Sequence, residues 1–422
     1  MSQALPRPKV VILGLDGVCW SQVQRLAAQG TMPRLGALTR DSFCGPMLST
    51  RPEISPVAWT TFFTARPPGH HGIYGFTEFE PGSYQIRYNS SAQVRVPFIW
   101  DRLGLGNRRS VALNIPLTYP ARPLAGIMVS GFVALDYDRA AYPGWVAQYL
   151  RETGYRLEAD FEKVRQDREA FLADLDQALG GRSRLLERFW PEDWDLFALV
   201  ITDTDRLHHF FWQESEEDGP ISEYFQDFFR RVDEIVGRVF DLAGDLAGKE
   251  NEDVYLVMLS DHGFTGVKKE FHLNRWLAAQ GFQAQAGPKS LALALDPTRI
   301  YLNRPPRFAQ GRVSPAEISA LSDRIRAGLM DEPAVAGVIS GQDIFAGPAL
   351  ALAPDLVVRP APGYEFKAKF TPGPVYTPSP LQGTHTYEDA FFLVHDFRKQ
   401  IEEPKVKEIL ALGEFVASLF DL

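Results

Sequence analysis

Short, uninterrupted runs of apolar residues recur along the chain. Three of them, at residues 9–15, 195–201 and 254–260, read KVVILGL, DLFALVI and VYLVMLS. Runs of this kind are typical of strands that are covered on both faces, as in a parallel sheet. Residues 111–114 and 127–130 have the same character and lie on either side of a proline-rich loop. The pattern predicts an α/β fold built on a mostly parallel central sheet.

Between these strands the apolar residues are spaced for helices. Residues 22–41 are predicted to form a helix interrupted by a glycine and a proline, and residues 143–190 are predicted to be helical with charged faces. Within residues 224–242, apolar side chains recur at steps of three and four, which predicts an amphipathic helix packed on the sheet. Asp233 and Glu234 are expected on the outer face of that helix.

The composition changes at residues 266–380, which are rich in proline and glycine and contain short alternating runs. We expect this segment to form a smaller, irregular lobe with one helix at residues 315–330, inserted into the core and shaping the substrate pocket. The catalytic core would then comprise residues 1–265 and 381–422. Its last strand is predicted at AFFLVHD, and an amphipathic helix at residues 406–422 would close it.

Composition and charge narrow the class of protein. The chain is 45% hydrophobic and 23% charged, as in an ordinary globular protein with a large core. Its net charge of −9 argues against binding to nucleic-acid polymers or anionic membranes, because such binding needs a basic surface. The apolar run before Asp16 is too short for a signal-peptide core, and no segment reaches transmembrane length. Cys19 and Cys44 provide neither a disulfide framework nor a paired-cysteine metal site. We therefore expect a cytoplasmic protein, whose oligomeric state the sequence does not specify.

Residues 52–73, PEISPVAWTTFFTARPPGHHGI, contain a candidate nucleophile. Ser55 is followed by Pro56, an order that predicts a helix N-terminus with the serine as N-cap and residues 57–64 as the helix body. A hydroxyl at that place would face unpaired backbone N–H groups and the positive end of the helix dipole, where a phosphate oxygen binds well. The alternative is that Ser55 only caps a buried helix.

An aspartate follows each of three predicted strands. Asp16 comes after the first strand as Asp-Gly, which by itself is typical of a simple turn. Asp205 and His209 come after residues 195–201 and are four residues apart, so on a helix their side chains share one face and can share a ligand. An ordinary surface ion pair is the alternative for these two residues.

Asp261 and His262 follow the strand at residues 254–260, and a loop presents His385 before the final strand. A carboxylate beside an imidazole is a suitable pair of ligands for a divalent metal ion. In one mostly parallel sheet, the carboxyl ends of the strands meet at the same edge. The residues expected to converge there also include Asp16, Ser55, Asp205 and His209. Two divalent cations close together need about this many nitrogen and oxygen ligands.

Five motifs in order resemble the alkaline-phosphatase superfamily, and within it the type I phosphodiesterase and nucleotide pyrophosphatase family. They are DG after the first strand, SPVAWTTFFTARPPGHHGI, TDRLHHFFW, SDHGF and GTH, and together they cover nearly the whole chain. The resemblance implies a three-layer α/β sandwich, in which helices flank the mostly parallel sheet. It also implies a metal-dependent hydrolase acting on phosphoric ester bonds of a small-molecule substrate.

The resemblance further implies two ligand sets. One metal ion would be bound by Asp16, Asp261, His262 and the Ser55 oxygen. The second would be bound by Asp205, His209 and His385. Ser55 would be the nucleophile and would form a phosphoserine intermediate. Zinc suits the mixture of aspartate and histidine best, with manganese or iron as alternatives.

Two points in the sequence leave alternatives open. Asp203 competes for the role of Asp205, but only Asp205 keeps the four-residue step to His209. Relatives that cleave diesters place an asparagine shortly after the HGI sequence, where this chain has Phe76. Tyr74 and Phe76 lie in an aromatic segment expected to form the rim of the substrate pocket, and Asn114 is a candidate for holding a phosphate oxygen.

The departure at Phe76 puts nucleotide pyrophosphatase activity in question without affecting the metal ligands. Phosphodiesterase activity is the main hypothesis. A phosphomonoesterase, a phosphonate hydrolase or a phosphotransferase on the same site are the alternatives, together with a non-catalytic metal-binding protein.

Overall fold

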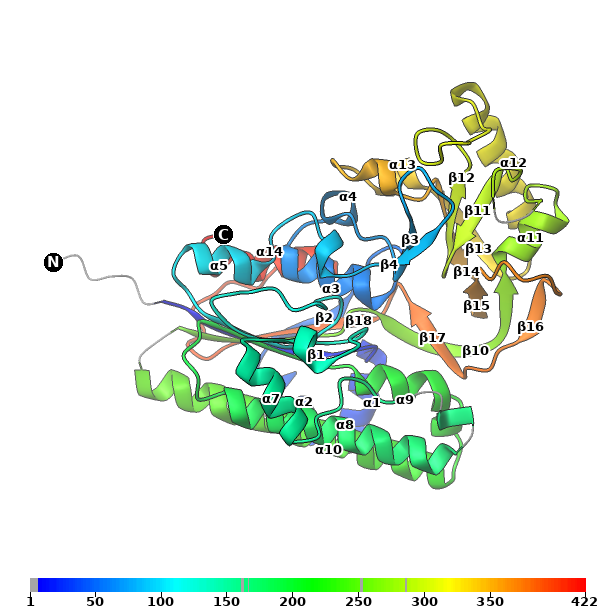
Figure 1. Ribbon diagram of the computed structural model, residues 1–422. Coiled ribbons are helices and arrows are strands. Elements are labelled where there is room, and N and C mark those ends of the chain that lie inside the picture. Colours follow the sequence, from blue (N-terminus) through cyan, green and yellow to red (C-terminus); the bar gives the residue numbers. More distant parts are fainter. Residues whose placement is uncertain (1–6, 161–162, 166, 251–252, 285–286) are drawn as a thin grey trace.

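The computed structural model describes residues 7–160, 163–165, 167–250, 253–284 and 287–422. Figure 1 shows a large layered core and a smaller lobe at one end of it. No helix among these residues is long and apolar enough to cross a membrane.

An eight-stranded sheet forms the middle of the core, in the order β2-β18-β9-β1-β8-β5-β6-β7. Strand β1 (Lys9–Leu15) pairs in parallel with β8 (Leu196–Ile201) on one side and with β9 (Val254–Leu259) on the other. Strand β5 (Ser110–Ile115) pairs in parallel with β8 and with β6 (Gly126–Ser130). These are the five strands expected from the apolar runs, and the mostly parallel sheet is confirmed.

The two edges of the sheet are antiparallel. Strand β18 (Ala390–Asp396) runs against β9 and against the edge strand β2 (Phe43–Met47), and β7 (Ala141–Tyr142) runs against β6. The strand predicted at AFFLVHD is therefore present. Strands β2 and β7 were not predicted, because they are short and β2 reads FCGPM, with a glycine and a proline inside it.

Helices cover both faces of the sheet, so the three-layer sandwich is confirmed (Figure 1). One face carries α1 (Trp20–Ala28), α2 (Pro33–Leu38), α7 (Gly144–Glu152), α8 (Arg168–Phe189) and α10 (Pro220–Glu250). The other carries α3 (Ser55–Thr64), α5 (Ile99–Leu105) and α14 (Ile409–Ser418). Alternate residues of β1 enter the two cores: Val11 and Leu13 face the first group of helices, and Val10 and Ile12 face the second.

The position of Asp233 on α10 corrects the sequence-based expectation. Its side chain is buried and accepts hydrogen bonds from the backbone N–H groups of Arg34 and Leu35, at 2.9 and 2.8 Å. These groups belong to the first turn of α2, where a helix has no internal acceptors for its N–H groups. Asp233 therefore caps a neighbouring helix, while Glu234 is exposed as expected.

The lobe is more regular than expected. One sheet has the order β11-β12-β14-β13, and a second contains β15, β10, β16 and β17. The strands are β10 (Gly263–His272), β11 (Ala292–Leu295), β12 (Arg299–Leu302), β13 (Val335–Ser340), β14 (Leu356–Pro360), β15 (Gly363–Lys367), β16 (Tyr376–Pro378) and β17 (Gly383–Thr386). Besides the expected helix, α12 (Ile318–Met330), there is an unpredicted helix α11 (Leu273–Ala279). The lobe has a hydrophobic cluster of its own around Trp276 and Phe271.

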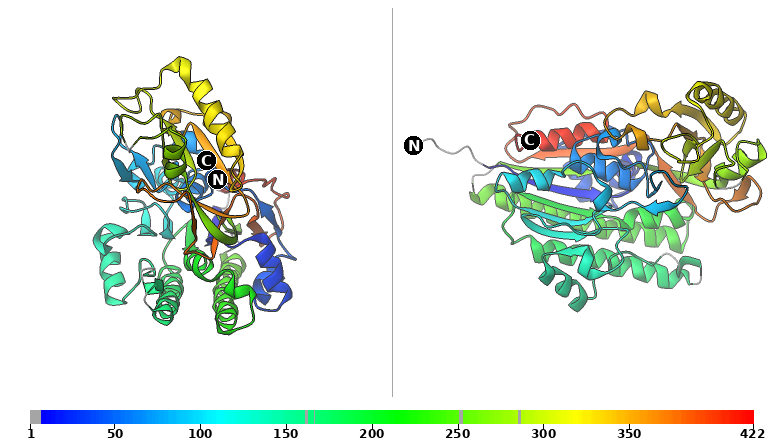
Figure 2. Two further views of the ribbon diagram at one scale, coloured as in Figure 1. Left: turned by 90° about the vertical axis from the view of Figure 1, so that its right-hand side faces the viewer. Right: turned by 45° about the horizontal axis from the view of Figure 1, so that its top comes forward.

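Shorter elements connect these parts. They are α4 (Pro68–His71), β3 (Thr77–Phe79), β4 (Ile86–Tyr88), α6 (Tyr137–Ala140), α9 (Asp203–Phe211) and α13 (Gly341–Ile344). Strand β10 begins directly after β9 and continues into the lobe, so it joins the two parts without a linker. Figure 2 shows the lobe beyond the end of the sheet that lies away from the N-terminus, which is the edge where the parallel strands finish.

Candidate metal centre

The residues singled out by the motifs meet at the carboxyl edge of the sheet. Asp16 follows β1, and Asp261 and His262 follow β9. Asp205 and His209 lie on α9, which begins directly after β8. Ser55 is the first residue of α3. Segments at β1, β9, α9 and α3, which are distant in sequence, thus contribute side chains to one place.

Asp16, Asp261, His262 and Ser55 form what we call the inner set. Nε2 of His262 lies 3.7 Å from Oδ1 of Asp16 and 3.3 Å from Oδ2 of Asp261. The Ser55 Oγ lies 3.4 Å from Oδ1 of Asp16 and 3.3 Å from Nε2 of His262. All four side chains are buried, and the two carboxylates and the imidazole each present an atom within 4.8 Å of the others, close enough to share one ion.

Asp205, His209 and His385 form the outer set. Oδ1 of Asp205 lies 3.4 Å from Nε2 of His209 and 3.2 Å from Nε2 of His385. The two Nε2 atoms are 3.0 Å apart. The rings of His262 and His385 stack with centroids 3.7 Å apart, so the inner and outer sets adjoin.

His385 reaches the site from a strand rather than from the loop expected from the sequence. It lies on β17, which pairs antiparallel with β10, and its direct partner in that pairing is Phe264. Because β10 continues from the end of β9, this pairing carries His385 back to the edge of the central sheet.

The hydrogen bonds of the three histidines prepare them to bind metal. Nδ1 of His209 is 3.0 Å from the carbonyl of Gly383, and Nδ1 of His385 is 3.0 Å from the carbonyl of Glu53. Nδ1 of His262 is 3.1 Å from the carbonyl of Gly263. A carbonyl oxygen only accepts, so each Nδ1 carries the proton and each neutral ring turns the lone pair of Nε2 into the site. Ring orientation by such partners is typical of histidine ligands.

This arrangement brings electron-rich atoms together. The neutral tautomers turn the Nε2 lone pairs of His209 and His385 toward each other, and Oδ2 of Asp261 has no hydrogen-bond donor among the described residues although it is buried. Buried acceptors without a donor are costly. A cation between them removes that cost, so the donor set fits two divalent metal ions.

Electrostatics at the site supports the same conclusion. Burial, with the charges of Asp261 and Asp205, raises the pKa of Asp16 well above its usual range. Burial and the charge of Asp205 raise the pKa of Asp261 to about 7. Burial lowers the pKa of His209 to about 4. Although burial acts against it, Asp205 raises the pKa of His385 by accepting a hydrogen bond from Nε2 of the protonated ring, and a metal ion would take the place of that proton. Clustered carboxylates of this kind release protons when a metal ion binds.

The hydroxyl of Ser55 is not used as a helix cap. The N-cap of α3 is Ile54, with extended φ and ψ of −139° and 145°, and Ser55 is the first helical residue instead of the expected N-cap. Pro56 has no N–H, and the N–H groups of Val57 and Ala58 both donate to the carbonyl of Ile54. The first N–H groups of the helix body are therefore already paired, and the hydroxyl of Ser55 lies toward Asp16 and His262.

The structure gives Asp203 and Asp205 different partners. Asp203 is buried and forms an ion pair with Arg182, with Nε 3.1 Å from Oδ2. His208, beside His209, is buried against Phe229 and Phe264 and contacts Gln22. Asp205 and His209 are the pair that faces His385, as the four-residue step predicted.

The three candidate substrate contacts have other neighbours. The buried hydroxyl of Tyr74 donates to the carbonyl of Ala349 at 3.1 Å, which ties it to the lobe. Phe76 is half-buried, with its ring 5.9 Å from that of Phe132. Asn114 is buried, and its amide nitrogen donates to the carbonyl of Val200 at 2.7 Å and to the hydroxyl of Thr202 at 3.2 Å. These contacts commit the Tyr74 hydroxyl and the Asn114 amide group to neighbouring segments.

Sequence reasoning missed two side chains that hold Asp16 and Asp205. Nε1 of Trp59 donates to Oδ2 of Asp16 at 2.9 Å, from one helical turn beyond Ser55. The guanidinium of Arg206 lies 3.4 Å from Oδ2 of Asp205, pairs with Glu158 and stacks over the ring of Phe132. Trp59 lies at the four-residue step from Ser55, and that spacing was the available signal.

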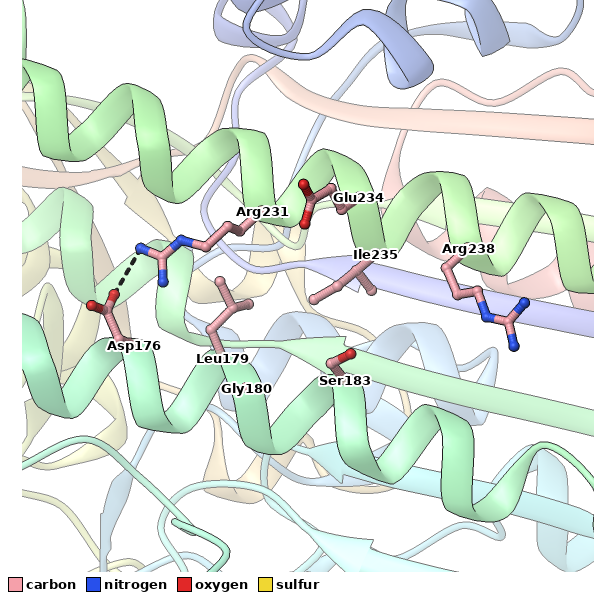
Figure 3. Close-up of a pocket in the computed structure, with 8 residues that line it drawn as sticks. All are labelled: Asp176, Leu179, Gly180, Ser183, Arg231, Glu234, Ile235 and Arg238. Carbon is pink, nitrogen blue, oxygen red and sulfur yellow. Dashed lines mark hydrogen bonds and ion pairs between the residues drawn. The ribbon is translucent and has the colours of Figure 1, made fainter.

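A separate groove of about 330 Å³ lies between α8 and α10 (Figure 3). Its lining residues are Asp176, Leu179, Gly180, Ser183, Arg231, Glu234, Ile235 and Arg238. Figure 3 shows Arg231 paired with Asp176, at 2.7 Å. The groove shares no residue with either ligand set, and its lining residues do not form a comparable group of converging ligands.

The fold and the clustered ligands together define an alkaline-phosphatase-like α/β protein with a candidate two-metal centre. The sequence model of the type I phosphodiesterase / nucleotide pyrophosphatase family matches residues 10–388. The chain therefore belongs to this family and is a hydrolase of that family. A search of curated proteins finds no match.

Solved structures with the same fold are distant in sequence. Phosphonoacetate hydrolase from Sinorhizobium meliloti 1021 is 15% identical, with a TM-score of 0.65 over 98% of this chain and 96% of that one. The alkaline phosphatase PafA is 17% identical, with a TM-score of 0.65 over 99% and 96%. Murine ectonucleotide pyrophosphatase / phosphodiesterase 5, in complex with AMP, is 14% identical, with a TM-score of 0.60 over 98% and 95%. At these identities the likeness establishes the fold alone.

Proposed function

We propose that this protein is a metal-dependent phosphodiesterase or related phosphohydrolase that uses Ser55 as its nucleophile. The observation that carries the proposal is the position of the Ser55 hydroxyl, which lies within 3.4 Å of both Asp16 and His262 inside a group of converging, buried metal ligands. A serine that only capped a helix would bond to the backbone of its own first turn, and Ser55 does not.

Two divalent cations would occupy the inner and outer sets, with zinc favoured by the histidine and aspartate ligands and manganese or iron as alternatives. When bound, such cations lower the pKa of a hydroxyl or water and neutralise charge on attacking and leaving oxygens. Trp59 holds Asp16 and the backbone carbonyls hold the histidines, so the ligands keep their orientation before substrate arrives.

In the proposed reaction, the Ser55 hydroxyl gives up its proton to solvent and its oxygen attacks phosphorus, and the bond from phosphorus to the leaving ester oxygen breaks as the new bond forms. The alcohol leaves after taking a proton from solvent. Water then cleaves the phosphoserine and restores the hydroxyl. The dipole of α3 stabilises the negative charge that collects at its N-terminus during both steps.

A second reaction on the same site deserves a direct comparison. The resemblance to diester-cleaving relatives implies an asparagine at the position where this chain has Phe76. The ring of Phe76 packs near that of Phe132. A phosphomonoesterase or a phosphonate hydrolase is therefore the alternative. One solved structure of this fold is a phosphonoacetate hydrolase, which agrees with that alternative.

The test is hydrolysis of a bis(aryl) phosphate, the matching aryl monoester and an aryl phosphonate by protein loaded with zinc or manganese. Faster cleavage of the diester supports the phosphodiesterase assignment. Faster cleavage of the monoester or the phosphonate would support the same site but a different reaction, phosphomonoester or phosphonate hydrolysis. Cleavage of none of them with either metal counts against the proposal, and Ser55→Ala with undiminished turnover would refute the covalent route.

A further inference from the structure

The first turn of α9 is tied to the rest of the core by consecutive side chains. Asp203 pairs with Arg182 of α8. The hydroxyl of Thr204 donates to the backbone carbonyl of Asp16 at 2.6 Å. Asp205 faces His385, and Arg206 pairs with Glu158. The helix that carries two of the three residues of the outer set is thus anchored at each residue of its first turn.

Arg182 is the most deeply buried of these anchors. Its guanidinium and the carboxylate of Asp203 are 0% and 1% exposed. The guanidinium makes two hydrogen bonds to Asp203, one to the hydroxyl of Tyr155, and others to the carbonyls of Arg156 and Leu157 at 2.7 and 3.4 Å. Every N–H of the fork is therefore engaged, as is needed for a buried charge.

The network continues to the strand before α9. The hydroxyl of Tyr155 lies 3.4 Å from Oδ1 of Asn114. Asn114 has a φ of 57° at a bulge in β5, and its amide donates to Val200 and Thr202 at the end of β8. Asparagine tolerates this left-handed conformation better than most residues. The junction between β8 and α9 is therefore held from Asn114 on one side and from Arg182 on the other.

A buried ion pair gives little net stability, since desolvation of both charges offsets most of their attraction. The ion pair can still fix geometry. A planar guanidinium that donates to five acceptor atoms permits one orientation of the carboxylate. Asp203 is separated from Asp205 by one residue and lies on the same helix as His209. A shift or tilt of α9 would move both ligands away from His385, which belongs to a different element.

We propose that Arg182 and Asp203 are positioning residues for the outer metal ion, acting through α9. The inference rests on the proposed two-metal centre. It goes beyond that centre by assigning a role to an ion pair that contains no metal ligand. The inner set depends on the pair less directly, because Asp16, Asp261 and His262 come from the ends of β1 and β9, and the hydrogen bond from Thr204 to the carbonyl of Asp16 reaches only the backbone of one of them.

The test uses the double variant Arg182→Met/Asp203→Leu, which removes both charges and leaves no unpaired ion in the core. We expect the double variant to fold and to bind one zinc ion with the affinity of the wild type. It should bind the second zinc ion about 10- to 100-fold more weakly, because changes to residues that orient metal ligands typically have effects of that size. The measurement is zinc titration of the metal-free protein against a chromophoric chelator, with metal content checked by elemental analysis.

The matched control is Asp355→Asn in the lobe. The side chain of Asp355 is 8% exposed and pairs with two arginines, Arg304 and Arg307, but it touches neither ligand set. We expect the control to lower the melting temperature and to leave both zinc affinities unchanged. An equal loss of the second zinc ion in both variants would mean that general destabilisation is responsible, which overturns the proposal.

Arg182→Lys provides the measurement if the double variant does not fold. Lysine keeps the charge opposite Asp203 but loses the fork, so we expect a folded protein with a smaller loss of affinity for the second ion alone. Wild-type affinity for both ions in either Arg182 variant overturns the positioning role. A wild-type protein that binds fewer than two ions overturns the two-metal centre itself, and the positioning role with it.

Discussion

The inner and outer ligand sets adjoin, but they are built in different ways. In the inner set the two aspartates and the histidine follow β1 and β9, adjacent strands in the middle of the sheet, and the side chains of Asp16 and His262 are 0% exposed. In the outer set the side chains of His209 and His385 are 13% and 14% exposed, and they come from α9 and β17. The inner set is positioned by strand register, whereas the outer set depends on how a helix and a lobe strand pack against the sheet. We therefore expect the outer metal ion to be the more sensitive to changes away from the site.

The largest effect is expected from Ser55→Ala. Loss of the attacking oxygen should lower turnover of the preferred aryl phosphate ester by at least about 10³-fold. The variant should stay folded, because Ser55 makes no capping bond. Initial rates and a thermal melt measure the two expectations. A folded alanine variant with wild-type turnover would show that Ser55 is not the nucleophile.

Single ligand changes test the independence of the two sets. His262 adjoins both, so His262→Ala should weaken the binding of both metal ions. His209→Ala should weaken only the outer ion, by more than the roughly 10- to 100-fold typical of residues behind the ligands. Metal content after dialysis against a chelator measures both losses. Loss of both ions in His209→Ala would mean that the sets bind as one unit.

A tryptophan change tests the support of the inner set. Trp59→Phe removes the hydrogen bond to Asp16 and should weaken the inner ion about 10-fold or more. Trp276→Phe is the matched control, since Trp276 is also buried and donates from Nε1 to a carboxylate, that of Glu332, at 2.8 Å in the lobe. Both should lose about 1–3 kcal/mol of stability, and only the first should change zinc affinity. Equal zinc affinities in the two variants would mean that Trp59 does not support metal binding at the inner set.

Metal binding should weaken as the pH falls. In the metal-free protein the pKa of Asp261 is raised to about 7, so below that pH its carboxyl holds a proton that a metal ion must displace. Affinity at the inner set should drop at least about tenfold between pH 8 and pH 6, because Asp261 alone gives that change and the raised pKa of Asp16 acts in the same direction. The raised pKa of His385 adds a drop at the outer set. Zinc titrations at the two pH values, and protons released on binding, measure the effect. Equal affinities at both pH values would contradict it.

The smallest effect is expected away from both sets. Asp233→Asn weakens the cap of α2 and should cost about 1 kcal/mol of unfolding free energy, with both metal affinities unchanged. Denaturant unfolding measures the cost. A change in metal binding would mean that the helical layer below the sheet affects the site.

Residues 9–15, 195–201 and 254–260 were predictable as strands because a strand covered on both faces needs apolar side chains throughout, whatever surrounds it. The shared helix face of Asp205 and His209 was also predictable, because it depends only on their four-residue spacing. The buried position of Asp233, which was expected on the outer face of its helix, was not predictable. Its partners on α2 are about two hundred residues earlier in the chain. The lobe sheets were missed because their strands are short and lie among prolines and glycines.

The sequence by itself determined that three buried strands are each followed by an aspartate, and that a serine stands at the start of a helix between the first and the second of these strands. Periodicity and end signals are local properties, and they were enough for the class of fold and the set of candidate ligands. Tertiary structure decided which residues meet: the pairing of β17 with β10 carries His385 to Asp205, and Arg182 takes Asp203 away from the metal centre. These decisions depend on contacts between distant segments and on the pairing of buried charges, which no local pattern specifies.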